Sequence, residues 1–364
     1  MTKKCLDCHD EEAAQLTERL RQSTLGYFDM LTIYIGQKLG LYEALAAAGP
    51  LTSGDLASRT DTHPRYVREW LEQQAVGGLL AVDDPELPHE NRHYRLPAGH
   101  GRVLVERDDP SWQGTRPHSL LPLARQMPAL LDAFRRGGGL SPVDHDDDSR
   151  MAQASLGRVA YLSSMGDWIA ALPDVDARLR REPPARVADL GCGAGWSAIA
   201  LASQYPLVHV DGFDIDAESV AMARENASAS GMADRVRFEA CDAGDPALAG
   251  NYALAVVFEA LHDMPRPVDA LRTLRRLAGE TGAVLVVDEK VDARFTAPGS
   301  DVERFTYGWS VLSCLASGMT GPDPAGTGAV MRPETLRGYA TSAGFNTLEI
   351  VPVSHDSWTF YRLR

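Results

Sequence analysis

The sequence predicts an α/β protein in which a mostly helical N-terminal region precedes a mostly parallel sheet. From Ala185 onward, short apolar runs alternate with helical patterns, as in a parallel sheet covered by helices on both faces. Before Ala185, helical periodicity dominates. The last two runs, 346–353 and 357–363, flank the short segment Ser-His-Asp and predict an antiparallel hairpin at one edge of the sheet.

Length, charge and cysteine content limit the classes of function. A chain of 364 residues predicts two domains, or one domain with a large extension. The net charge of −14 disfavours nucleic acid and anionic membranes as partners, and no apolar run is long enough to span a bilayer. Five scattered cysteines and the lack of a secretory signal favour the cytoplasm. Small-molecule partners fit these properties best.

The N-terminus predicts a disordered tail at 1–15 and a long helical region at 16–45. Cys5, Cys8 and His9 spell the C-x-x-C-H pattern of haem attachment, but that chemistry requires export, so a disordered tail is favoured. The following helical pattern is apolar on nearly every side. Such a helix needs burial on more than one face, which predicts a homodimer through the N-terminal helices.

Residues 52–105 have the spacing of a helix-turn-helix with a wing. Thr52 or Ser53 can cap one helix, and Pro64 can begin the next. The segment 93–105 could supply strands of a wing. DNA binding is one interpretation, but acidic residues outnumber arginines here. We therefore favour a structural or dimerising winged-helix domain over 16–105.

Residues 106–182 predict a helical linker or cap interrupted by an acidic loop. Asp144, His145 and Asp146–Asp148 could be read as ligands of a hard cation. Adjacent charges in a loop rich in glycine and proline are more often simply solvated. We therefore predict no metal site.

The stretch VADLGCGAGWSAIAL, residues 187–201, predicts a buried strand, a glycine turn and a helix. Gly191, Gly193 and Gly195 let the backbone approach a ligand closely, and the helix that follows offers unpaired N–H groups. A dinucleotide fingerprint requires a small residue where Trp196 stands. The pyrophosphate of NAD is therefore disfavoured, and another nucleoside is expected.

Acidic residues follow the next two predicted strands. Asp214 lies about 20 residues after the glycine turn, the spacing at which an acid accepts hydrogen bonds from ribose hydroxyls. Asp242 follows the next strand and could accept from an adenine amino group. Because these strand ends offer no Lys or Arg for a phosphate, the expected ligand is an adenosine without phosphates.

The motifs DLGCGAG, GFDID, CDA and EALHDMP together resemble those of class I S-adenosylmethionine-dependent methyltransferases. Residues 16–105 resemble the winged-helix dimerisation domain of small-molecule methyltransferases. The resemblance implies a Rossmann-like, seven-stranded, mostly parallel sheet with an antiparallel last strand over 183–364. It also implies an enzyme with S-adenosyl-L-methionine as cofactor and a small-molecule methyl acceptor.

The resemblance also implies where the cofactor binds. The three glycines would surround its methionine and ribose portion, with Asp189 near the ammonium. The implied contacts to the remaining parts of the cofactor are Asp214 and Ile215 at the ribose, Asp242 and Ala243 at the adenine, and Glu259 beside the cofactor.

Methyl transfer is an in-line displacement that needs a base only if the acceptor arrives protonated. His262, in EALHDMP, follows the fourth predicted strand, where the acceptor should approach. We expect it to be that base, oriented by Asp263 or Glu259. The alternative is a loop histidine that packs or caps the following helix.

Residues 291–331 are long for a connection and predict a lid over the acceptor. Tyr307, Trp309, Cys314 and Met319 would line it and favour a hydrophobic or aromatic acceptor, although core packing explains each singly. The lid segment is similar to that of a bacterial subgroup of these enzymes, except that Ala316 stands where a proline is expected.

Two other functions remain open at this point. One is a regulator whose helix-turn-helix binds DNA while the adenosine site senses a ligand. The other is a methyltransferase fold that performs a different reaction or none.

Overall fold

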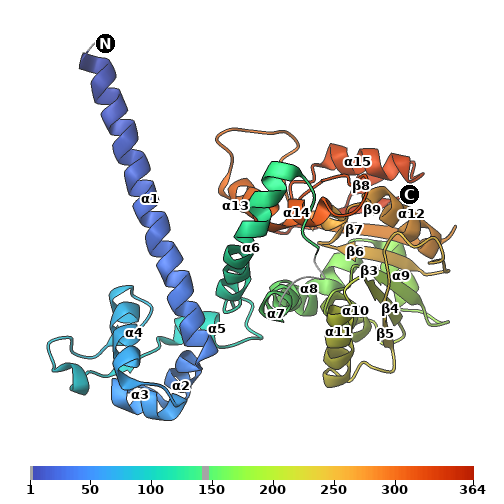
Figure 1. The fold of residues 1–364 in the computed structure, drawn as a ribbon. Coiled ribbons are helices and arrows are strands. Elements are labelled where there is room, and N and C mark those ends of the chain that lie inside the picture. Colours follow the sequence, from blue (N-terminus) through green and yellow to red (C-terminus); the bar gives the residue numbers. More distant parts are fainter. Residues whose placement is uncertain (1–2, 142–146) are drawn as a thin grey trace. The chain divides into compact units, whose positions relative to one another are not determined.

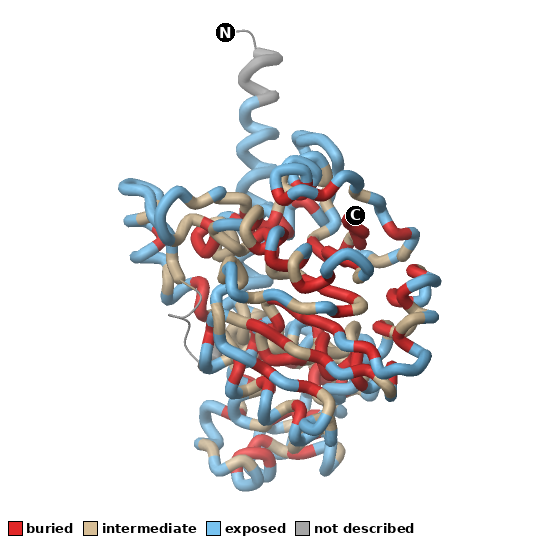
Figure 2. The backbone as a smooth tube through the Cα atoms, turned by 90° about the vertical axis from the view of Figure 1, so that its right-hand side faces the viewer, coloured by how far each residue is buried: buried red, intermediate tan, exposed pale blue. Residues whose placement is uncertain are grey.

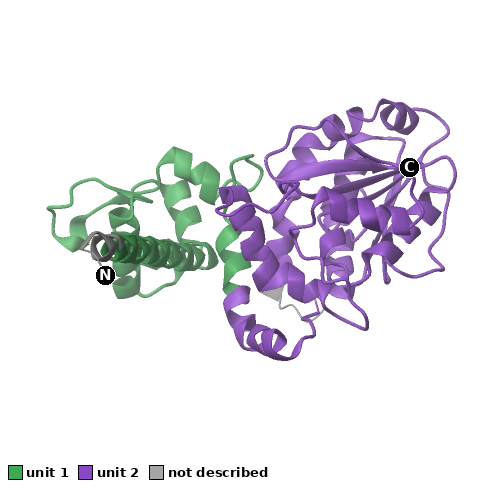
Figure 3. Ribbon diagram, turned by 90° about the horizontal axis from the view of Figure 1, so that it is seen from above, with its two compact units in different colours: residues 1–121 green, residues 122–364 purple. Residues whose placement is uncertain are grey.

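The computed structural model describes residues 3–141 and 147–364 and divides the chain into two compact units, 1–121 and 122–364 (Figures 1 and 3). Most of the expected linker, 106–182, therefore belongs to the second unit. The predicted acidic loop lies largely at 142–146, outside the described residues, as do the side chains of Cys5 and Cys8.

The first unit begins with the long helix α1 (Lys3–Lys38), followed by α2 (Leu41–Ala48). Residues 3–15 of the tail expected to be disordered belong to α1, and residues 10–20 are rich in helix-forming Glu, Ala, Gln and Leu. The prediction of one helical region through residue 45 missed a break at Gly40, whose φ of 65° ends the helix. Most of α1 is exposed (Figure 2).

A helix-turn-helix follows in the first unit. The Thr52 side chain caps α3 (Ser53–Thr60) by accepting from the Asp55 N–H, and Pro64 begins α4 as predicted. The predicted wing is minimal, because residues 98–104 form a helix instead of a strand. The remaining elements are α4 (Pro64–Val76), β1 (Ala81–Val82), a 3₁₀ turn (His89–Asn91), β2 (Tyr94–Arg95) and α5 (Ala98–Leu104).

The sheet of the second unit confirms the predicted fold class. Its seven strands have the order β5-β4-β3-β6-β7-β9-β8; β3 to β7 are parallel, and β9 is antiparallel to both of its neighbours. The strands are β3 (Arg186–Leu190), β4 (His209–Asp214), β5 (Val236–Ala240), β6 (Leu254–Phe258), β7 (Ala283–Glu289), β8 (Leu348–Ile350) and β9 (Trp358–Leu363).

Helices bury both faces of this sheet (Figure 1). One apolar core joins the sheet to α8, α9, α10 and α11, and a second joins its other face to α12 and α15. The lid segment contains α13, a π-helical turn (Ser310–Cys314) and α14. The helices of this unit are α6 (Arg116–Arg136), which begins in the first unit, α7 (Asp147–Leu156), α8 (Arg158–Ala170), α9 (Pro173–Leu179), α10 (Trp196–Gln204), α11 (Ala217–Ala229), α12 (Pro267–Ala278), α13 (Asp301–Trp309), α14 (Leu315–Gly318) and α15 (Pro333–Ser342).

Among the described helices, none combines the length and the apolar character that crossing a bilayer would require.

Candidate functional site

The three glycines after β3 have different structural roles. All adopt positive φ, at 73°, 49° and 81° for Gly191, Gly193 and Gly195. A Cβ on Gly195 would lie 2.5 Å from Phe238 Cζ, and one on Gly191 would lie 2.7 Å from Ala260 Cβ, so both permit tight packing. A Cβ on Gly193 would meet no described heavy atom within 4 Å. The space beside Gly193 is thus open, so a ligand can approach the backbone there.

Asp214 joins the end of β4 to this glycine loop. Its Oδ2 accepts from the Gly193 N–H at 2.7 Å, and its Oδ1 accepts from the Asp216 N–H at 2.9 Å. Burial raises the pKa of this carboxyl. Ile215, the next residue, is 56% exposed and leaves an apolar side chain beside the carboxylate.

Asp189 is a buried carboxyl at the end of β3. Its Oδ2 accepts from Ser197 Oγ at 2.5 Å, whereas its Oδ1 has no hydrogen-bond partner among the described residues. Burial raises its pKa to about 7. A buried carboxyl oxygen without a partner is costly, and a ligand ammonium would satisfy it. The unpaired Oδ1 of Asp189 and the open space beside Gly193 both fit the amino-acid end of S-adenosylmethionine.

Arg158, at the start of α8, brings a cation to the same loop. Its guanidinium carbon lies 4.6 Å from the centre of the Trp196 ring, and Trp196 is the first residue of α10. Sequence reasoning missed Arg158 because nothing in its own segment marks it. Arg158 lies near the glycine loop because α8 packs against α10. Both helices contribute to the core on one face of the sheet.

Asp242 follows β5, the strand that neighbours β4 in the sheet. The side chain is exposed; its Oδ1 accepts from the Gly244 N–H and its Oδ2 from Arg266 Nη2, both at 2.8 Å. Ala243, the next residue, is half-buried. The carboxylate thus enters an ion pair with Arg266 that the sequence did not reveal.

His262 lies buried in a 3₁₀ turn, Leu261–Asp263, just beyond β6. Its Nδ1 is 2.6 Å from Asp288 Oδ1, and its Nε2 is 3.3 Å from Asp263 Oδ1. Burial disfavours the imidazolium, but the two carboxylates outweigh burial and raise the pKa of His262 well above 6.5. Asp263 was one expected orienting residue, whereas Asp288 was missed. The available signal was the position of Asp288, an acidic residue within the largely apolar strand 283–289.

Of the four predicted lid residues, Cys314 is the one that the described contacts bring to His262: its Sγ, a ring nitrogen of His262 and a carboxyl oxygen of Asp263 lie within 4.8 Å of one another. Burial raises the pKa of this thiol to about 12. The hydroxyl of Tyr307 accepts from Arg332 at 3.3 Å. Trp309 packs edge-on against Phe305. Met319 lies against Gly326.

Glu259 ends β6 with a φ of 49°, an uncommon value for a residue with a side chain. Its carboxyl accepts a hydrogen bond from Trp358 Nε1. Burial, followed by the charge of Glu289, raises its pKa well above 4.5. Glu259 thus lies at the end of β6, the strand between β3, which precedes the glycine loop, and β7, which carries Asp288.

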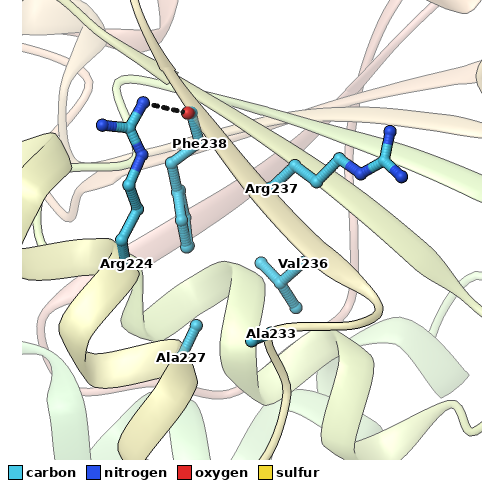
Figure 4. A pocket seen from close by; sticks show the side chains of 6 residues that line it. All are labelled: Arg224, Ala227, Ala233, Val236, Arg237 and Phe238. Carbon is cyan, nitrogen blue, oxygen red and sulfur yellow. Dashed lines mark hydrogen bonds between the residues drawn. The ribbon is translucent and has the colours of Figure 1, made fainter.

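A pocket of about 360 Å³ lies elsewhere, between α11 and the edge strand β5 (Figure 4). Its lining includes Val236, the first residue of β5, and Arg224, which donates to the Phe238 carbonyl. The amino end of a strand is opposite the loops that bind ligands in such sheets. This pocket is therefore separate from the candidate cofactor site.

Two family models match the chain. Residues 182–315 match a methyltransferase domain, and residues 29–106 match an Rv2258c-like winged HTH domain. The release factor glutamine methyltransferase of Chlorobaculum tepidum is 39% identical over 70 residues, which are 19% of this chain and 22% of that protein. The trans-aconitate 2-methyltransferase of Streptomyces avermitilis is 35% identical over 100 residues, 27% of this chain and 37% of that protein. The chain thus spans well under half the length of these curated relatives.

Solved structures resemble the chain over nearly its whole length. Mitomycin 7-O-methyltransferase MmcR has a TM-score of 0.71 at 19% identity, with 98% of this chain and 99% of that chain covered. Human N-acetylserotonin methyltransferase, in complex with SAM, has a TM-score of 0.72 at 19% identity, with 96% and 97% covered. These likenesses confirm the predicted fold. The chain therefore joins an Rv2258c-like winged helix-turn-helix domain to a methyltransferase domain of the class I fold.

Proposed function

We propose that the protein transfers a methyl group from S-adenosyl-L-methionine to a small-molecule acceptor. The observation that carries this proposal is the combination of the empty space at Gly193, the adjoining Asp214 carboxylate and the orphaned oxygen of Asp189. When bound, the cofactor supplies an electrophilic methyl group on a sulfonium. Small-molecule methyltransferases among the structural neighbours support the same reaction.

Each end of the cofactor has complementary residues. Asp189 holds the ammonium and Arg158 the carboxylate of the methionine portion, a zwitterion that needs one acid and one base. Asp214 accepts from the ribose hydroxyls, and Ile215 covers the nucleoside. Asp242 and the backbone of Ala243 hold the adenine.

His262 accepts the proton of an acceptor that arrives protonated, with its Nδ1 hydrogen held by Asp288. The lid residues Tyr307, Trp309, Cys314 and Met319 enclose a hydrophobic or aromatic acceptor. The protein works as a cytoplasmic homodimer. DNA binding is disfavoured, because on α4 Arg65 pairs with Glu69 at 2.5 Å, and Glu72 pairs with Arg92 at 3.2 Å.

The decisive experiment incubates the protein with methyl-labelled S-adenosylmethionine and native cell extract and follows the label. Label in one small molecule would support the proposal and identify the acceptor by mass. Intact cofactor binding without transfer would contradict it and favour a ligand sensor, which a mobility shift of DNA at moderate salt would then test.

Arg158→Gln is expected to weaken S-adenosylhomocysteine binding about tenfold or more, because a charged hydrogen bond contributes about 1.5–3 kcal/mol. Binding of 5′-methylthioadenosine, which lacks the amino-acid tail, should not change. Calorimetric titration of both compounds checks this, with the surface variant Arg237→Gln as control. An equal loss for both compounds would assign Arg158 to the fold instead.

The double substitution of Leu16 and Leu20 by glutamate is expected to convert the dimer to a monomer. Both side chains are more than half exposed on α1, and burial against a second copy would remove this apolar surface from water. Light scattering after size-exclusion chromatography measures the mass, with Gln15→Glu as control. A monomeric parent protein would refute the dimer.

A further inference from the structure

Two carboxyls and two aromatic rings meet at the ends of β6, β7 and β9. Glu289 is paired with Trp358 in the register of β7 and β9. Trp358 Nε1 donates to Glu259. Tyr161, from α8, stacks on Trp358 with ring centres 5.5 Å apart and an angle of 16°. We call Glu259, Glu289, Tyr161 and Trp358 the glutamate–aromatic wall.

The wall holds two buried carboxyls whose ionised forms are disfavoured, because burial raises the pKa of both. Burial raises the pKa of Glu289 to about 7. The cation whose charge acts on both glutamates is His262, which already pairs with Asp288 at 2.6 Å. Asp288 is itself only 2% exposed in its side chain, and its Oδ2 has no hydrogen-bond partner among the described residues. Its charge raises the pKa of both glutamates.

The backbone supports a role in binding rather than in packing. Phe258 and Trp358 belong to one core, on the α8 face of the sheet. Strict alternation along β6 would direct Glu259 to the opposite face, yet it contacts Trp358. This change of face coincides with its positive φ, and strain of this kind at a strand end is retained where function requires it.

We propose that the glutamate–aromatic wall binds a positively charged amino group of the methyl acceptor, so that the acceptor is an amine with an apolar body. This inference rests on the proposed methyl transfer and narrows its substrate class. Tyr161 and His355 both stack on the ring of Trp358, so the two carboxyls are the groups of the wall that would attract an organic cation. A bound ammonium group stabilises the ionised form of these carboxyls, which an alcohol group does not do. Because Glu259 lies three residues before His262, whose charge acts on it, the amino group would lie near the proposed proton acceptor.

The test compares two pairs of probes that differ only in an amino or a hydroxyl group. Tryptamine with tryptophol, and tyramine with tyrosol, are titrated calorimetrically into the full-length protein saturated with S-adenosylhomocysteine. The product form of the cofactor has no sulfonium, so the wall is not occupied by that charge. We expect each amine to bind at least about tenfold more tightly than its alcohol.

Glu289→Gln, which keeps the shape of the side chain, should abolish the preference for amines and leave S-adenosylhomocysteine affinity unchanged. Glu289→Asp should restore part of the preference. Glu280→Gln, an exposed substitution after α12, should change neither quantity.

Three results would overturn the inference. They are equal affinity for amine and alcohol, no measurable binding of either amine, and a Glu289→Gln variant that changes only the affinity ratio of S-adenosylmethionine to S-adenosylhomocysteine. The last result would assign the wall to the sulfonium. A failure of the proposed function is distinguishable, because the unsubstituted protein would then not bind S-adenosylhomocysteine or would not transfer label.

Discussion

Replacing Asp214 with alanine is expected to weaken the binding of S-adenosylmethionine about 100-fold. A hydrogen bond from a hydroxyl to a carboxylate contributes about 1.5 kcal/mol, and a tenfold change in affinity corresponds to about 1.4 kcal/mol. Loss of both ribose hydroxyl bonds therefore removes two factors of about ten. The substitution also removes the acceptor of the Gly193 N–H, so the loop loses one of its hydrogen bonds to β4, while those of Gly191 and Cys192 to Phe213 remain.

Calorimetric titration measures this change, and thermal unfolding separates it from a loss of fold. Asp211→Asn is the matched control, because Asp211 lies on the same strand but pairs with Arg186 at 2.6 Å and takes no part in the glycine loop. Unchanged cofactor affinity in Asp214→Ala would contradict the proposed ribose site. Equal losses in Asp211→Asn would show that the effect is a general one on β4.

His262→Ala is expected to reduce kcat about 100-fold or more with cofactor affinity unchanged, because general base catalysis contributes about 10²–10⁴-fold. The acceptor identified by labelling serves as substrate. Since the pKa of His262 is raised well above 6.5, the imidazole is protonated near pH 7 and must lose its proton to act as a base. The kcat of the unsubstituted protein should therefore rise with pH above neutrality.

Asp288→Asn removes one of the two carboxylates that stabilise the imidazolium, so it lowers the pKa of His262 and shifts the rise in kcat to lower pH. The maximal rate should also fall, because the amide no longer fixes the Nδ1 hydrogen as the carboxylate does. Asp301→Asn, on the exposed start of α13, is the control. A pH profile that is identical in Asp288→Asn and the unsubstituted protein would exclude His262 as the base.

Local motifs made much of the fold and part of the site predictable. The glycine turn, Asp214 and His262 lie at or just beyond strand ends, where the change from an apolar run to polar residues marks their place in the sheet. Asp189, in contrast, was assigned through family resemblance, and the structure adds its orphaned oxygen. Their roles remain predictions.

The missed residues come from elements distant in sequence. Arg158 reaches Trp196 because α8 packs on α10, and Trp358 on β9 reaches Glu259 at the end of β6 across the intervening strand β7. Such meetings depend on the register and order of the whole sheet, which periodicity within a segment does not encode. The break at Gly40 was missed for a different reason: the apolar pattern continues through it, and a single glycine within a helical pattern is often tolerated.

The position of β9 between β7 and β8 has a consequence for biosynthesis. Although β8 is translated first, its one partner in the sheet is β9, so β8 cannot join the sheet until residues 358–363 have left the ribosome. Trp358 begins β9, and its indole completes the contact with Glu259. A nascent chain that folds from its N-terminus must therefore wait for β9 before this end of the sheet closes. Translation that stops before residue 358 should yield a protein that lacks β9, leaves β8 without its partner and cannot form the contact between Trp358 and Glu259.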